Sequence, residues 1–143
     1  EFEQAVPIME AIKENYPTFN EFSVINPVII SNVIKNFCHL KKISLKWPND
    51  LLINKKKICG ILQELITLNN KKFLIVGIGI NIASSPNIDN NYQTTNILHE
   101  TKKKPAIKEL MKSITISYED FFFNIKSYNY VSLKKIADSM AIK

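Results

Sequence analysis

Apolar residues recur along the chain with two different periods, and these periods predict its secondary structure. From Asn26 they fall at helical spacing as far as about His39, with Asn26 as the expected N-cap and Pro27 in the first turn. Pro105 opens a second helix with one apolar stripe, and the tail beyond Tyr130 is also expected to be helical. Helices therefore flank the middle of the chain.

Between these helices, apolar and polar residues alternate as they do in strands. The expected strands are Ile43–Trp47, Leu51–Ile53, Ile58–Thr67 and Phe73–Ile82. The lysine run Lys55-Lys56-Lys57 and the pair Asn69-Asn70 supply turns, so the strands form an antiparallel meander. The Ser- and Asn-rich stretch from Ala83 to Leu98 is expected to be a long surface loop.

The first 22 residues have the least regular pattern. Pro7 and Pro17 bracket the segment Ile8–Tyr16, whose apolar residues predict a short helix. We treat residues 1–22 as an atypical N-terminal segment of a single domain that covers residues 1–143. The elements together predict a mixed α/β (α+β) fold, in which helices pack on one largely antiparallel sheet.

Composition restricts the class of protein. With 143 residues, of which 45% are hydrophobic, the chain is long enough for one buried core. No run approaches the ~18 consecutive apolar residues of a membrane-spanning helix, so no membrane partner is expected. The two cysteines, Cys38 and Cys59, are too few for a disulfide framework or a cysteine-rich metal site, and free thiols suit the cytoplasm.

The net charge of +6 comes from 19 lysines and no arginine. A basic nucleic-acid-binding module would interleave aromatic residues with lysines on one face, whereas Phe121-Phe122-Phe123 lies in a predicted amphipathic helix and is expected in the core. Without arginine, anion binding must rely on lysine and backbone N–H groups.

The three glycines, Gly60, Gly77 and Gly79, all lie inside predicted strands. The two-residue period places Gly77, Gly79 and Asn81 on one face of their strand, with a continuous aliphatic face on the other. Glycine weakens a strand interior, so this face is predicted to form the floor of a ligand pocket. The alternative is that the glycines make room for a crossing helix.

A second cluster of polar residues lies in the block Lys46-Trp47-Pro48-Asn49-Asp50. Pro48 restricts the backbone, so the short polar side chains of Asn49 and Asp50 are held at a strand junction. An ordinary turn would explain the same residues. Lys57 has a similar alternative, because most lysines in hairpin turns are simply solvated.

Taken in order, these residues resemble the central signature of biotin protein ligases. The matching blocks are Lys46-Trp47-Pro48-Asn49-Asp50-Leu51, Lys57-Ile58-Cys59-Gly60-Ile61-Leu62-Gln63-Glu64 and Gly77-Ile78-Gly79-Ile80-Asn81. The resemblance is clear from about Phe22 to Asn96 and continues more loosely to about Phe123. Lipoate ligases share the fold but lack the Trp-Pro-Asn-Asp block, which makes the match specific.

The resemblance implies a fold like the catalytic domain of class II aminoacyl-tRNA synthetases and a two-step reaction that uses ATP, biotin and Mg²⁺. Biotin and ATP give biotinyl-5′-AMP, and a lysine of the biotin carboxyl carrier protein of acetyl-CoA carboxylase or a related carboxylase then takes the biotin. Lys57 is implied at the biotin carboxylate and the phosphate, with Asp50 beside it as the second catalytic residue. The implied binding residues are Lys46, Trp47, Asn49, Gly60, Gly77, Gly79 and Asn81, and no protein metal ligand is implied.

The chain also departs from the family pattern. The Gly-Arg-Gly-Arg loop and the Ser-Thr-Asn segment of these ligases are missing between Glu1 and Phe22, and no C-terminal β-domain or DNA-binding domain is present in the sequence. We therefore expect a partial ligase catalytic domain. The alternative from another class is a noncatalytic remnant that binds ligand or a partner weakly.

Overall fold

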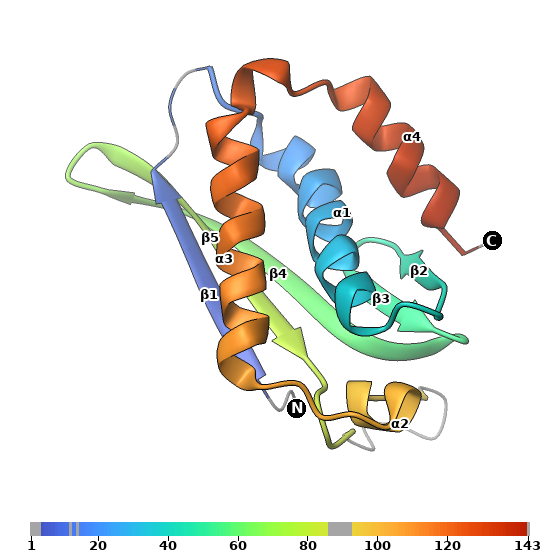
Figure 1. Cartoon of the computed structure of the whole chain (residues 1–143). Helices are drawn as coiled ribbons and strands as arrows, with labels where there is room; N and C mark the ends of the chain where they lie inside the picture. The colour runs from blue at the N-terminus through green and yellow to red at the C-terminus, as the bar shows by residue number, and fades with distance from the viewer. Residues whose placement is uncertain (1–3, 12, 14, 86–92, 143) are drawn as a thin grey trace.

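The computed structural model describes residues 4–11, 13, 15–85 and 93–142. Figure 1 shows a sheet with helices packed on one of its faces. The strands are β1 (Gln4–Ala11), β2 (Ile43–Lys46), β3 (Asp50–Ile53), β4 (Lys56–Leu68) and β5 (Lys71–Ile80). The helices are α1 (Phe19–Phe37), α2 (Ile97–Thr101), α3 (Ile107–Phe123) and α4 (Tyr130–Met140), with a 3-10 turn at Ile125–Ser127.

The sheet has the order β1-β5-β4-β3-β2, and every neighbouring pair is antiparallel. The predicted meander is therefore confirmed for β2 to β5. The prediction that all three lysines of the run form the turn was wrong. The left-handed residues are Asn54 and Lys55, with φ of 50° and 63°, so Lys56 and Lys57 already belong to β4. The Asn69-Asn70 turn is confirmed, with φ of 50° and 62°.

The N-terminal segment forms a strand, and the short helix predicted over Ile8–Tyr16 was wrong. Strand β1 pairs with β5 along its whole length, from Gln4 opposite Ile80 to Ala11 opposite Phe73. This pairing gives hydrogen-bond partners to the backbone N–H and C=O groups along the edge of β5. The apolar spacing within residues 4–11 cannot reveal a partner that lies so far along the chain. Pro7 is tolerated because β1 is an edge strand, where a missing N–H need not break the ladder.

Helix α1 begins about two turns earlier than the pattern predicts. Thr18 is its N-cap: the Thr18 hydroxyl accepts from the Glu21 N–H at 3.2 Å, and the Glu21 carboxylate accepts from the Thr18 N–H at 2.7 Å. This reciprocal capping box fixes the helix start. Asn26 is therefore not the N-cap, and both Asn26 and Pro27 are buried inside the helix.

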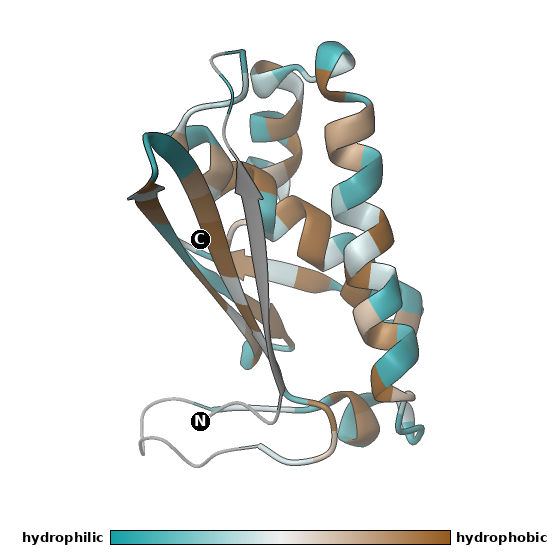
Figure 2. Cartoon of the chain, turned by 90° about the vertical axis from the view of Figure 1, so that its left-hand side faces the viewer, coloured by the Kyte–Doolittle hydropathy of each residue, from teal (hydrophilic) through white to brown (hydrophobic). Residues whose placement is uncertain are grey.

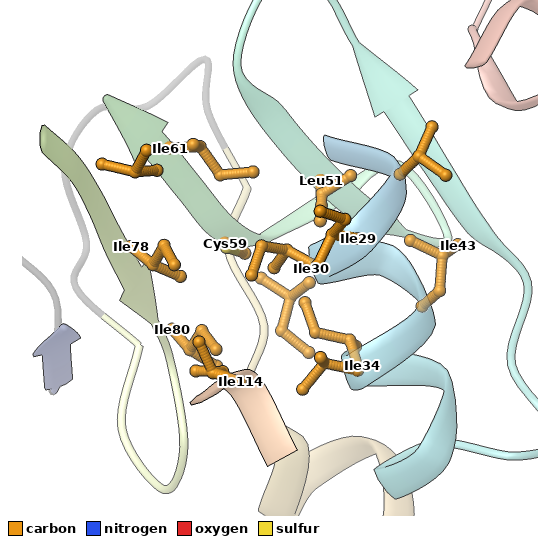
Figure 3. Close-up of a cluster of buried hydrophobic side chains, with 14 of the residues drawn as sticks. Ile29, Ile30, Ile34, Ile43, Leu51, Cys59, Ile61, Ile78, Ile80 and Ile114 are labelled. Atoms are coloured by element: carbon orange, nitrogen blue, oxygen red, sulfur yellow. The ribbon is translucent and has the colours of Figure 1, made fainter. Parts of the chain in front are cut away.

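The core lies between the sheet and α1, α3 and α4. Figure 2 shows the helices standing on one side of the strands, and Figure 3 shows aliphatic side chains of α1, such as Ile30 and Ile34, beside Ile78 and Ile80 of β5. The predicted aliphatic face of β5 is confirmed as core. The two C-terminal helices are confirmed, and α2 occupies the end of the predicted loop. No described helix is both long enough and apolar enough to cross a membrane.

Candidate functional site

The register of the sheet places several predicted site residues in one row. Lys46 pairs with Asp50, Asp50 with Gly60, and Gly60 with Gly79, across four neighbouring strands. Paired residues of antiparallel strands point to the same face. Their chain neighbours, such as Leu51, are buried against the helices, so the row lies on the opposite face of the sheet.

Lys57 contributes the cation of this site. Its Nζ lies 3.0 Å from Oδ1 of Asp50, and the two side chains are only 17% and 15% exposed. The Lys57 backbone is also held: its N–H donates to the Gln93 carbonyl at 2.9 Å, and its carbonyl accepts from the Thr95 N–H at 2.8 Å. An ordinary turn lysine has none of these constraints, so the alternative of a solvated lysine does not describe Lys57.

Asn81 lies just beyond the end of β5 and is 1% exposed. Its Nδ2 donates to the carbonyl of Thr95 at 3.1 Å and to that of Lys57 at 3.5 Å, and its backbone N–H donates to the Ile58 carbonyl. Its Oδ1 is buried and has no hydrogen-bond partner among the described residues. Asn81 thus holds the strand that carries Lys57, and it retains one acceptor. Its contact with a nucleotide stays a prediction.

The Trp-Pro-Asn block joins the site to the helices. The Trp47 ring lies 5.7 Å from the Lys134 ammonium of α4, and the Trp47–Pro48 peptide bond is cis. The Asn49 carbonyl accepts from the Ile61 N–H at 2.9 Å, which joins this turn to β4. Asn49 also lines a cavity of about 270 Å³ with Pro48. Ligand roles for Trp47 and Asn49 stay predictions.

Gly77 lies one pair further along the sheet, opposite Leu62. Among the atoms that the structure describes, a Cβ placed on Gly77 would meet only the Leu62 carbonyl oxygen, at 3.9 Å, so none of the described helices occupies the space above it. Leu62 points to the same face and is 68% exposed. The packing explanation for Gly77 therefore fails in the structure, whereas a ligand-binding role is still a prediction.

A hydrogen-bond chain that starts at the buried Tyr118–Asn26 pair was not anticipated from the sequence. The Tyr118 hydroxyl donates to Asn26 Oδ1 at 2.9 Å, Asn26 Nδ2 donates to Gln63 Oε1 at 2.9 Å, and Gln63 Nε2 donates to the Phe19 carbonyl at 2.8 Å. The chain joins α3, α1 and β4. The sequence signal for it is Asn26, a single polar residue in the apolar stripe of a helix. An Asn side chain is buried only when its amide has hydrogen-bond partners.

The chemistry of the site is that of an anion-binding surface. Lys57 and Lys46 are its lysines, and Asp50 is the carboxylate of the row. Cys59 lies two residues after Lys57 in β4, but burial raises the pKa of its thiol, so it is no nucleophile at neutral pH. Among the described residues there is no group of three or more His, Cys, Asp or Glu that could hold a metal. A Mg²⁺ ion that arrives bound to substrate phosphates would need no such group of protein ligands.

A sequence profile described as "Biotin/lipoate A/B protein ligase family" matches residues 12–81, the range that includes β2 to β5 and the Lys57–Asp50 pair. The chain is thus similar to the biotin/lipoate A/B protein ligase family over just under half of its length. Biotin–protein ligase 2 of Arabidopsis thaliana is 31% identical over 119 residues, which cover 75% of this chain and 34% of that protein. The chain spans about a third of the length of the curated relatives it matches.

Solved structures of biotin protein ligases share the fold of this chain. The biotin protein ligase of Aquifex aeolicus in complex with biotin and ATP aligns with a TM-score of 0.76 and 22% identity, covering 96% of this chain and 58% of that one. The biotin protein ligase of Leishmania major in complex with biotinyl-5-AMP gives 0.78 and 21%, covering 96% and 60%. The biotin-ligase-like fold is thus confirmed.

Proposed function

We propose that this chain carries the adenylate site of a biotin protein ligase, on the glycine-lined face of the sheet. The observation that carries the proposal is the Lys57–Asp50 ion pair, 3.0 Å apart, at the end of the Asp50-Gly60-Gly79 row. The partly buried Lys57 cation thus lies beside a stretch of backbone without side chains. A site for a carboxylate, a phosphate and a flat ring system needs these two features together.

In the first step, a biotin carboxylate oxygen attacks the α-phosphorus of ATP. A new O–P bond forms, the bond to the β-phosphate oxygen breaks, and pyrophosphate leaves. Negative charge accumulates at the phosphorus in the transition state, where a fixed ammonium stabilises it most. Lys57 is suited to this role because hydrogen bonds to Gln93 and Thr95 hold its backbone on both sides.

In the second step, the neutral amine of a carrier lysine attacks the acyl carbon of biotinyl-5′-AMP. The acyl–phosphate bond breaks, AMP leaves, and the amine loses a proton. We propose a carboxylase biotin carrier domain as the acceptor and the cytoplasm as the compartment, in keeping with two buried free cysteines. Mg²⁺ would enter with ATP and offset phosphate charge.

Asp50 has a separate role in this proposal. With no ligand bound, it balances the Lys57 ammonium at 3.0 Å, which keeps that charge in place on a partly buried surface. When phosphate binds, Lys57 lies between two anions. Removal of the Asp50 carboxylate should therefore misplace Lys57 rather than remove its charge.

One observation favours a second candidate, a noncatalytic biotin-binding protein. The chain has no arginine to hold the phosphate by a two-pronged contact. Such a protein would bind biotin on the same glycine face, but it would form no adenylate.

A direct assay separates these candidates. The chain is incubated with biotin, ATP and Mg²⁺, and biotinyl-5′-AMP and pyrophosphate are measured by mass spectrometry and a coupled phosphate assay, with lipoate in place of biotin as the specificity control. The proposal predicts biotin-dependent adenylate and little product from lipoate. Biotin binding by calorimetry without adenylate would favour the noncatalytic candidate, and absence of both in a folded chain would overturn the proposal.

A further inference from the structure

The start of β4 is held by a segment that lies far along the chain. Strand β5 pairs with β4 only from Cys59 onward, and before that point Thr94 forms a parallel bridge with Lys57. The Lys57 N–H donates to the Gln93 carbonyl at 2.9 Å, and the Thr95 N–H donates to the Lys57 carbonyl at 2.8 Å. The position of the Lys57 backbone therefore depends on what holds Thr95.

Thr95 is buried and is held through both its backbone and its side chain. Its carbonyl accepts from Asn81 Nδ2 at 3.1 Å, and its hydroxyl donates to Oε1 of Glu100 at 2.7 Å. Asn81 lies just past the end of β5, whereas Glu100 belongs to α2, which Figure 1 shows beyond the end of β5. The two contacts thus join Thr95 to different parts of the fold.

Glu100 is in turn joined to the loop after α1. Its second carboxylate oxygen, Oε2, lies 3.5 Å from Nζ of Lys41, and the Lys41 N–H donates to the Cys38 carbonyl at 3.0 Å. The Glu100 side chain is only 6% exposed. A continuous series of contacts therefore runs from the loop after α1, through Glu100 and Thr95, to the Lys57 backbone.

The Glu100 carboxylate is buried although the helix that carries it does not require it. Removing a carboxylate from water costs free energy unless its oxygens have polar partners. The N-cap of α2 is Asn96, whose side chain already accepts from a backbone N–H of the first turn at 2.7 Å. The contacts of the Glu100 carboxylate are instead with Thr95 and Lys41, so they join this helix to its neighbours.

We infer that Glu100 is a positioning residue for adenylate formation: it holds Thr95, and Thr95 holds the Lys57 backbone. The inference rests on the proposed function, because that function gives Lys57 its role in the transition state. A displacement of about 1 Å at a catalytic group can cost ~100-fold in rate. The Asn81 amide still supports Thr95 when Glu100 is changed, so a smaller loss of about 10-fold is expected.

Glu100→Ala and Thr95→Val remove the two ends of the same hydrogen bond. Each should lower kcat for biotin-dependent pyrophosphate release about 10-fold and change KM for biotin less, because positioning matters most in the transition state. Thr95→Ser retains the hydroxyl and should keep nearly the wild-type kcat. Glu109→Ala is the matched control: Glu109 is an exposed carboxylate of α3 that lines the same cavity as Glu100, and its removal should leave kcat unchanged.

A double-mutant cycle tests whether Glu100 acts through Lys57. All rates are measured below the melting temperature of each variant and divided by the folded fraction from circular dichroism, so a loss of stability alone leaves kcat unchanged. In the Lys57→Ala background the positioned ammonium is gone, so Glu100→Ala should lower the rate no further. Multiplicative losses in this cycle, or equal kcat values for Glu100→Ala and Glu109→Ala, would overturn the inference.

Amide hydrogen exchange gives a readout that needs no activity. The Thr95 N–H donates to the Lys57 carbonyl, so its exchange rate reports how firmly this segment is held. Glu100→Ala should accelerate exchange at Thr95 about 10-fold after correction for global stability at the core amide of Ile78, and Glu109→Ala should not.

This measurement separates the inference from the proposed function. A wild-type chain that forms no adenylate would overturn the proposed function, and exchange at Thr95 would then decide by itself whether Glu100 holds the segment that binds Lys57. Unchanged exchange at Thr95 in Glu100→Ala would overturn the inference, whatever the activity of the wild-type chain.

Discussion

Replacing Gly77 by Ala separates a ligand role from a packing role. Neither Gly77 nor any other glycine of the chain has a positive φ, so an L residue fits the backbone. Of the atoms in the described residues, the nearest to an added Cβ is the Leu62 carbonyl oxygen at 3.9 Å, which is an ordinary contact. The free protein should therefore accept the methyl group without moving.

The space beside Gly77 sets the changes in stability and in biotin affinity that Gly77→Ala should cause. Alanine restricts the unfolded chain more than glycine does, which should stabilise the fold by about 0.4–1 kcal/mol and raise the Tm by a few degrees. If Gly77 forms the floor of the proposed biotin site, the same methyl would occupy space that biotin needs. A loss of ~10-fold or more in affinity, about 1.4 kcal/mol, is expected.

Thermal unfolding and titration calorimetry with biotin on the same samples measure both effects. Lys72→Ala, at an exposed position of β5, is the control and should change neither quantity. If Gly77→Ala lowered the Tm by more than ~4 °C, equivalent to about 1 kcal/mol or more in a domain of this size, and left the affinity unchanged, glycine would be needed for packing and the reasoning would be refuted.

Two further predictions concern buried groups. Tyr118→Phe removes the donor to buried Asn26 and should lower the free energy of unfolding in urea by about 1–3 kcal/mol, whereas Tyr130→Phe should not; equal values for the two would contradict the buried network. Burial, with a smaller contribution from the Glu100 carboxylate, raises the pKa of Cys38 to about 11, so alkylation at pH 8 should be ~100-fold slower than for a free thiol and should accelerate as pH rises toward 11. A rate at pH 8 equal to that of a free cysteine would contradict this.

The sheet was largely predictable because its signals are local. Alternating residues mark β2 to β5, and Asn69-Asn70 marks a two-residue turn. Strand β1 was not predictable, because its conformation is imposed by the distant edge of β5. The start of α1 was not predicted, although its signal is local. Thr18 followed three residues later by Glu21 is the pattern of a capping box, and Pro17 precedes the N-cap.

The site was predictable only in part. Asp50 and Lys57 belong to one hairpin, and their convergence follows from the turn at Asn54 and Lys55, with a bulge in the β3–β4 register. The Lys57 backbone forms hydrogen bonds with Gln93 and Thr95, and no sequence pattern near either segment predicts that contact. Long-range bonds of this kind depend on the whole fold.

The central claim is that Lys57, held beside Asp50, is the group that promotes adenylate formation. Biotin-dependent pyrophosphate release by Lys57→Ala, compared with Lys55→Ala in the adjacent turn, tests it most directly. Loss of a cation that stabilises the transition state predicts a fall of ~100-fold or more for Lys57→Ala, measured below the melting temperature of that variant, and little change for Lys55→Ala. Equal, small effects of the two substitutions would contradict the claim.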